Sequence, residues 1–154
     1  MRQFFSRITQ AATEDRLPSL IFSIAPRWID EIVEGRKTIE LRRRPPRLTG
    51  PVKAYLYETS PSCRLRVRCL VGPVISAPPR DLWDLVGVQS CVNKEHFDKY
   101  FAEVPIAHGI VLKGVQDLGE DLTLGRLRDE GFHPPQAWCY ASSKFDSWIE
   151  TRLW

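Results

Sequence analysis

The residues with the clearest capacity for chemistry lie in one short run, in which basic side chains surround a single carboxylate. The run reads Gly35-Arg36-Lys37-Thr38-Ile39-Glu40-Leu41-Arg42-Arg43-Arg44. Crowded cations repel one another, so a folded protein usually keeps such a cluster where an anionic partner compensates for the repulsion. Within it, Lys37 can contact a phosphate as a point charge or supply an amine of lowered pKa. The alternative is a structural salt bridge from Lys37 to Glu34 or Glu40.

Glu40 is the only carboxylate of this run, and three roles suit it. It can orient Lys37 or Arg42, accept hydrogen bonds from the edge of a base, or act as a general base. If Lys37 and Glu40 share a cleft, each favours the charged form of the other. That coupling favours anion binding and opposes a neutral lysine base. In an extended strand, Arg42 and Arg44 point to the same side as Glu40.

A second arginine cluster, Arg64, Arg66 and Arg68, alternates with apolar residues. Between positions 36 and 68 there are ten basic and two acidic residues, whereas the net charge of the whole chain is only +3. Most of the ten are arginines, which bind phosphate oxygens through two parallel hydrogen bonds. The segment therefore predicts a basic surface for a phosphate-rich partner, nucleic acid above all. The alternative is a solvated face that keeps the protein soluble.

Aromatic and hydroxyl side chains accompany these clusters. Tyr55 and Tyr57 alternate with core positions, and Thr59, Ser60 and Ser62 follow in a loop. Tyrosines beside arginines suit base stacking, at roughly 1–3 kcal/mol for each base, or they can pack under a helix. The hydroxyls can hold a phosphate or an acyl oxyanion, or simply form the turn. The candidate nucleic-acid-binding residues are Arg36, Lys37, Glu40, Arg42, Arg44, Tyr57, Thr59, Arg64, Arg66 and Arg68. The candidate catalytic residues are Lys37, Glu40 and Ser60.

The composition is that of one soluble domain with a substantial core. The chain has 154 residues, of which 43% are hydrophobic and 27% charged. We expect residues 1–16 to form an N-terminal arm or short helix, and residues 17–154 to form a single domain that ends in an amphipathic helix. No apolar run approaches the roughly 18 residues of a membrane span, and no secretory signal is apparent. A cytoplasmic location without membrane contact is therefore expected.

The four cysteines and three histidines do not have the spacing of a metal site. The cysteines include no C-x-x-C pair, and the histidines are isolated from one another. We therefore expect reduced thiols, no metal and no cofactor. No P-loop or G-x-S-x-G motif is present, which argues against a standard NTPase or serine hydrolase. The oligomeric state is not indicated.

Hydrophobic periodicity predicts the elements that must position these residues. Strands are predicted at 20–24, 38–42, 52–58, 64–75, 108–115 and 137–141. Helices are predicted from Pro26 to just before Gly35, at 80–86, at 94–102 and after a capping Ser143, with 122–129 a loop or short helix. Consecutive strands of period two favour an α+β class, a small and mostly antiparallel β-barrel with peripheral helices. The arginines of the second cluster point away from its core.

The first run also resembles the hallmark of a known family. ASCH domains, within the PUA-like fold, carry a G-x-K-x-x-E-x-R motif directly after their first helix, and Gly35, Lys37, Glu40 and Arg42 match it position by position. Weaker similarities lie at 57–61, 97–101 and 134–138. The resemblance covers about residues 20–141 of this sequence.

The resemblance implies a cleft lined by the motif and a role in RNA binding. Some ASCH relatives are ribonucleases, and a related group removes the acetyl group of N4-acetylcytidine with a lysine like Lys37. That group has threonine or serine where this chain has Glu40. We therefore expect RNA or nucleotide binding in a basic cleft. The alternative is an enzyme in the same cleft, a metal-independent ribonuclease or a modified-nucleoside amidohydrolase, with Thr59 or Ser60 as nucleophile. A third interpretation is a protein-interaction domain that docks through its terminal helix.

Overall fold

The computed structural model describes residues 17–153, so the arm predicted at 1–16 lies outside the described residues. These residues form six strands and five helices. The strands are β1 (Leu20–Ile24), β2 (Ile39–Arg42), β3 (Val52–Glu58), β4 (Arg64–Ala77), β5 (Ala107–Asp117) and β6 (Trp138–Tyr140). The helices are α2 (Pro26–Val33), α3 (Pro79–Ser90), α4 (Lys94–Tyr100), α5 (Leu124–Asp129) and α6 (Ser143–Arg152).

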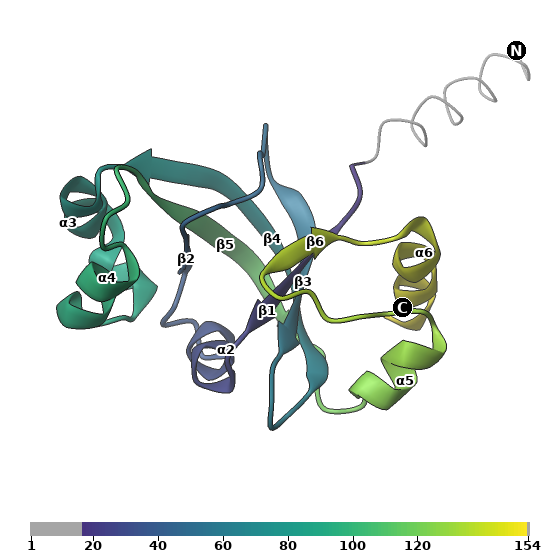
Figure 1. Ribbon diagram of the computed structural model, residues 1–154. Coiled ribbons are helices and arrows are strands. Elements are labelled where there is room, and N and C mark those ends of the chain that lie inside the picture. Colours follow the sequence, from purple (N-terminus) through teal and green to yellow (C-terminus); the bar gives the residue numbers. More distant parts are fainter. Residues whose placement is uncertain (1–16, 154) are drawn as a thin grey trace, which may run out of the picture.

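The strands form one mixed sheet in the order β2-β5-β4-β3-β1-β6. β1 and β3 are parallel, and the other neighbours are antiparallel. The sheet curls into a half-barrel, with α3 and α4 at one end and α5 and α6 at the other (Figure 1). The predicted α+β, PUA-like and mostly antiparallel class is therefore confirmed. The barrel is open, because β2 and β6 are edges.

The alternation of the strands divides the apolar residues between two faces of this sheet. Phe22, Leu56 and Val67 lie on the inner face, in the cluster that α2 covers with Ile29. Tyr55 points to the other face, where residues of α5 and α6 complete a second cluster. A third cluster packs one side of β2 against α3 and α4. The alternation of residues predicted for the strands thus decides which side chains enter which cluster.

Helix α2 and the turn after it determine where the motif begins. Pro26 occupies the first turn, where its missing N–H costs nothing. Gly35 has a φ of +78°, a conformation that suits glycine, and its N–H donates to the carbonyl of Ile32 at 3.1 Å. The Lys37 N–H then donates to the carbonyl of Glu31 at 2.9 Å. This turn directs the side chain of Lys37 back beneath the helix.

Several element boundaries differ from the prediction by a few residues, and two of them have a local explanation. Helix α3 continues to Ser90, although the sequence suggested an end near Val86. Gly87 lies inside the helix because the ring of Trp83 packs on it, and an added Cβ would lie 2.8 Å from that ring. The cap of α6 is Ser142, not Ser143, since the Ser142 hydroxyl accepts from the Phe145 N–H at 3.1 Å.

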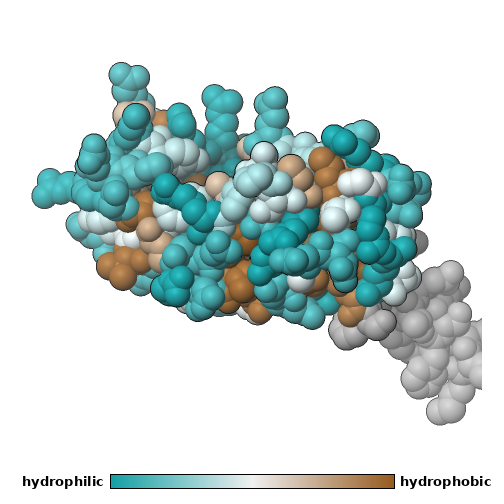
Figure 2. Space-filling view, turned by 90° about the horizontal axis from the view of Figure 1, so that it is seen from below, coloured by the Kyte–Doolittle hydropathy of each residue, from teal (hydrophilic) through white to brown (hydrophobic). Residues whose placement is uncertain are grey.

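The surface and the thiols are those of an ordinary globular chain. Hydrophilic side chains cover most of the face that carries α2, and the apolar ones form small, separate patches (Figure 2). Within residues 17–153, no helix combines the length and apolar character that crossing a bilayer requires. All four cysteines are free thiols, and of these Cys69 is buried. Burial raises the pKa of the Cys69 thiol to about 12.

Candidate nucleic-acid interface

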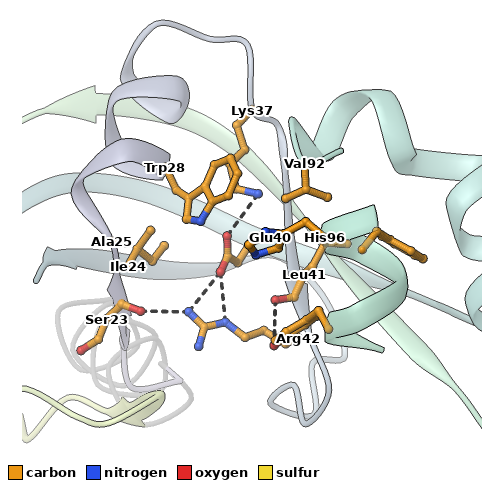
Figure 3. A pocket seen from close by; sticks show the side chains of 12 residues that line it. Ser23, Ile24, Ala25, Trp28, Lys37, Glu40, Leu41, Arg42, Val92 and His96 are labelled. Atoms are coloured by element: carbon orange, nitrogen blue, oxygen red, sulfur yellow. Dashed lines mark hydrogen bonds and ion pairs between the residues drawn. The ribbon is translucent and has the colours of Figure 1, made fainter. Parts of the chain in front are cut away.

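Lys37, Glu40 and Arg42 of the G-x-K-x-x-E-x-R motif line a cavity of about 220 Å³ between α2, β2 and α4. Trp28 and Val92 lie on opposite sides of Glu40, whose carboxylate lies between Lys37 and Arg42 (Figure 3). The lining residues are Ser23, Ile24, Ala25, Trp28, Lys37, Glu40, Leu41, Arg42, Val92, His96, Phe97 and Tyr100. The cavity is below the roughly 300–1,000 Å³ of sites for drug-sized ligands. It suits one base or one ribose and excludes a duplex.

Lys37 is the most deeply buried charge of the pocket, with 2% of its surface exposed. Its ammonium donates to the backbone carbonyl of Ser90 at 2.8 Å, at the end of α3. Burial lowers the pKa of the Lys37 amine, although the nearby Glu40 carboxylate acts in the opposite direction. The effect of Glu40 has the expected direction, but desolvation is the larger effect.

Glu40 joins the two basic residues of the motif. One carboxylate oxygen, Oε2, lies 3.5 Å from the Lys37 ammonium. The other, Oε1, accepts from Nε of Arg42 at 3.1 Å. Arg42 also donates to the carbonyl of Ser23 in β1 at 3.0 Å, which ties the edge strand β2 across to β1 (Figure 3). The common orientation of Glu40 and Arg42 is as the strand alternation predicted.

The Lys37–Glu40 pair presents hydrogen-bonding groups of both kinds to the cavity. An ammonium has three N–H donors, and Lys37 directs one to Ser90 and faces Glu40 at a distance longer than a strong hydrogen bond. A carboxylate has about four acceptor positions, so Glu40 retains capacity to accept. A ligand with adjacent donor and acceptor atoms, such as a base edge or a ribose hydroxyl, fits this arrangement.

Aromatic side chains form the walls above this floor. Trp28 comes from α2, and His96 meets it edge-on with a centroid distance of 6.3 Å. Tyr100 comes from α4, and its hydroxyl donates to the carbonyl of Leu41 at 3.4 Å. Sequence analysis missed these walls, because Trp28 and the aromatics of α4 fit equally well as core residues. The concentration of aromatics in 97–101 was the available signal.

Two exposed arginines stack on aromatic rings that line the cavity. The guanidinium carbon of Arg27 lies 3.9 Å from the centroid of the Trp28 ring. That of Arg43 lies 4.7 Å from the centroid of the Tyr100 ring. Cation–π contacts of this kind hold a guanidinium plane in place while its edge stays available. Neither Arg27 nor Arg43 is among the binding residues predicted from the sequence.

The second arginine cluster does not reach the pocket. Arg64 and Arg66 lie at a different place, where Arg64 meets Glu58 at 2.6 Å and Arg66 meets Asp117 at 2.6 Å. Arg68 approaches Glu150 of α6 at 3.7 Å, on the sheet face opposite the α2-covered core. The prediction of one shared basic groove is therefore wrong. These arginines are paired with acids of their own surroundings, of which Asp117 and Glu150 are distant in the sequence.

Other candidate residues are also placed apart from the motif. Tyr57 is only 3% exposed and packs against Phe132 at a centroid distance of 5.6 Å, so it cannot stack on a base and the stacking prediction is wrong. Burial raises the pKa of Tyr57 to about 12. Thr59 and Ser60 lie in the turn between β3 and β4 and do not line the pocket. The candidates outside the pocket are thus Arg36, Arg44, Tyr57, Thr59, Ser60, Arg64, Arg66 and Arg68.

Arg36 and Arg44 belong to the first run, but their side chains have other surroundings. Arg36 is exposed and forms a two-pronged hydrogen bond with Glu31, at 2.7 and 3.1 Å. The pKa of Arg36 is raised by this bond. Arg44 is also exposed, and its backbone carbonyl accepts from the indole N–H of Trp138 at 2.8 Å. That bond fixes the end of the motif strand against β6.

Comparison with known proteins agrees with the fold. The chain matches the ASCH domain family over residues 22–149 and belongs to that family. It is 24% identical over 119 residues to an ASCH domain-containing ribonuclease of Zymomonas mobilis, covering 76% of this chain and 80% of that protein. The crystal structure of ASCH from Zymomonas mobilis has a TM-score of 0.81 at 21% identity, covering 87% of this chain and 94% of that one. The N-terminal domain of Staphylothermus marinus McrB has a TM-score of 0.54 at 9% identity, with 87% and 93% coverage.

Proposed function

We propose that this protein binds single-stranded RNA by holding one nucleotide unit in the pocket between α2 and α4. The observation that carries the proposal is the row of Lys37, Glu40 and Arg42 in an aromatic cavity, with Lys37 and Glu40 buried. Two cations and one carboxylate leave an excess of positive charge, which suits a ligand linked to phosphates. The Zymomonas relative named as a ribonuclease supports RNA as the nucleic acid.

The walls and the size of the cavity favour an unpaired nucleotide. Trp28 and Tyr100 offer ring faces for a splayed base, and such stacking contributes roughly 1–3 kcal/mol for each base. A base that stays within a duplex would not reach Glu40, which is 8% exposed at the floor. The donor and acceptor of the Lys37–Glu40 pair also suit a 2′-hydroxyl, the group that distinguishes RNA from DNA.

The test is binding of labelled 12-nucleotide RNAs, measured by fluorescence anisotropy, against the DNA and duplex forms of the same sequences. Lys37→Met and Arg42→Met should weaken single-stranded RNA binding by roughly tenfold or more, because each removes a charge-assisted contact. Arg128→Ala, an exposed change on α5, is the matched control. Equal affinity of the pocket variants and the control would exclude this pocket as the binding site.

Cleavage of RNA in the same pocket is the second candidate function, and the buried amine of lowered pKa at Lys37 favours it. In that reaction the 2′-hydroxyl loses its proton to a base in the pocket and its oxygen attacks the adjacent phosphorus. The bond from phosphorus to the 5′-oxygen breaks, and that oxygen takes up a proton. The protein needs no hydroxyl nucleophile, which agrees with the distance of Ser60 from the pocket.

End-labelled RNA incubated with and without chelator tests for cleavage. The expected products end in a 2′,3′-cyclic phosphate. One deoxynucleotide at the cleavage position should prevent cleavage, because it lacks the attacking 2′-hydroxyl. Intact RNA after prolonged incubation would leave binding as the function. Release of acetate from N4-acetylcytidine, followed in parallel, would instead identify an amidohydrolase. We propose further that residues 17–154 act as a single domain in these reactions.

A further inference from the structure

The stacked arginines at the rim are the charged groups that the proposed function does not yet use. Arg27 and Arg43 are both exposed, and within residues 17–153 neither forms a salt bridge with a carboxylate. Arg36, Arg64 and Arg66 are each paired with an acid. The two stacked guanidiniums therefore keep their charge available to a ligand.

Their positions are fixed by the same rings that wall the pocket. Arg27 lies on Trp28 of α2, and Arg43 lies on Tyr100 of α4. Helices α2 and α4 stand on either side of β2 (Figure 1), so the two rings on which the arginines stack come from different walls of the cavity. A guanidinium that stacks by its face still offers N–H groups along its edge, in a fork that matches a phosphate.

We propose that Arg27 and Arg43 bind the two phosphates on either side of the nucleotide held in the pocket. The preferred ligand is then an internal nucleotide of a single strand, and a free nucleoside or a chain end lacks one of the contacts. This inference rests on the proposed function and adds the substrate class to it. Each arginine recognises a backbone group, so each contributes affinity without base preference.

Titration of small ligands tests the assignment of one phosphate to each arginine. The probes are the four common ribonucleosides, their 3′-phosphates, their 5′-phosphates and their 3′,5′-bisphosphates, measured by calorimetry. Arg27→Ala and Arg43→Ala should each lower bisphosphate affinity roughly tenfold. Each should weaken only one of the two monophosphate series and leave nucleoside affinity unchanged. Arg128→Ala should change none of them.

The salt dependence of 12-nucleotide RNA binding gives a second readout that needs no tight small-molecule complex. Each phosphate contact contributes a slope of about −0.7 in log affinity against log salt for single strands. Arg27→Ala and Arg43→Ala should each make the slope shallower by about that amount. Arg27→Lys should restore the slope, because it restores the charge.

Three outcomes separate this inference from the proposed function. Unchanged bisphosphate affinity and unchanged slopes in both variants would overturn the phosphate assignment while the Lys37→Met effect still upheld the pocket. Equal losses for nucleosides and bisphosphates would also overturn it, by showing that the arginines only hold the rings of Trp28 and Tyr100. Insensitivity of RNA binding to Lys37→Met and Arg42→Met would overturn the proposed function itself.

Discussion

The ammonium of Lys37 lies 3.5 Å from the carboxylate of Glu40, and both side chains are buried. Lys37 precedes strand β2 and Glu40 lies within it, and the turn at Gly35 lets the lysine reach the same cavity. A buried ion pair stabilises a fold only when its geometry and further hydrogen bonds offset desolvation. Here Ser90 and Arg42 supply those bonds. Both residues of the pair also line the cavity.

Glu40→Gln should lower the free energy of unfolding by about 3 kcal/mol, because it leaves the buried Lys37 ammonium without its counter-charge. The pKa of Lys37 should fall further, since the raising influence of Glu40 is lost. Urea denaturation measures the first effect, and NMR titration of the lysine side chain measures the second. Glu34→Gln, at an exposed site, is the matched control. Similar stability of the two variants would contradict this account.

Trp28→Leu should weaken RNA binding by roughly 1–3 kcal/mol, the contribution of one stacked base. Tyr57→Phe should leave affinity unchanged, because Tyr57 is buried away from the pocket. Anisotropy with the same single-stranded probe compares them. A loss of affinity in Tyr57→Phe without a loss in Trp28→Leu would place the stacking site elsewhere.

Asp117 should titrate far below its ordinary value, because its hydrogen bond to Arg66 holds its pKa at about 2 rather than 3.8. As pH falls, the unfolded chain binds this proton first. The stability that the pair contributes is therefore complete above about pH 4 and is lost as pH falls toward 2.

Arg66→Met should raise the pKa of Asp117 toward 3.8, and carboxyl NMR titration would detect the change. Arg80→Met, in α3 at the other end of the sheet, should leave the pKa of Asp117 as it is. A pKa that stays low in Arg66→Met would assign the effect to the Gly119 N–H, which donates to Asp117 at 2.9 Å.

Gly87→Ala should destabilise the protein by about 1–3 kcal/mol, the usual cost of overpacking. The added methyl group would lie 2.8 Å from the ring of Trp83, which packs on Phe97. A Cβ added at Gly125 in α5 would meet no atom within 4 Å. Gly125→Ala should therefore be neutral or slightly stabilising, since alanine favours helices. Thermal unfolding of both variants decides between a real packing contact and a tolerant one.

Local patterns were enough to predict the strands, helix α2 and the meeting of the motif side chains. Alternation placed Glu40 and Arg42 on one side of β2. The Pro26 start and the Gly35 stop of α2 depend on single residues whose backbone preferences are strong. These features require only neighbours within about ten positions.

The surroundings of the second arginine cluster could not be read in this way. Arg66 is paired with Asp117, which is 51 positions away, and Arg68 approaches Glu150 of the last helix. Tyr57 is buried by Phe132, which arrives with the segment after α5. The sequence shows how side chains alternate on a strand, but the acids and rings that cover a face come from distant elements.

One wall of the pocket is built by an excursion that is separate from the motif. Residues 78–106 leave the sheet after β4 and return at β5, and they carry α3 and α4 with Val92, His96 and Tyr100. The charged floor belongs to β2. Substitutions at Val92, His96 or Tyr100 would reshape the entrance. Ser90 of the same excursion is tied to the floor, because its carbonyl accepts from the Lys37 ammonium at 2.8 Å. A change in the length of the excursion ahead of Ser90 would therefore displace the lysine together with the wall.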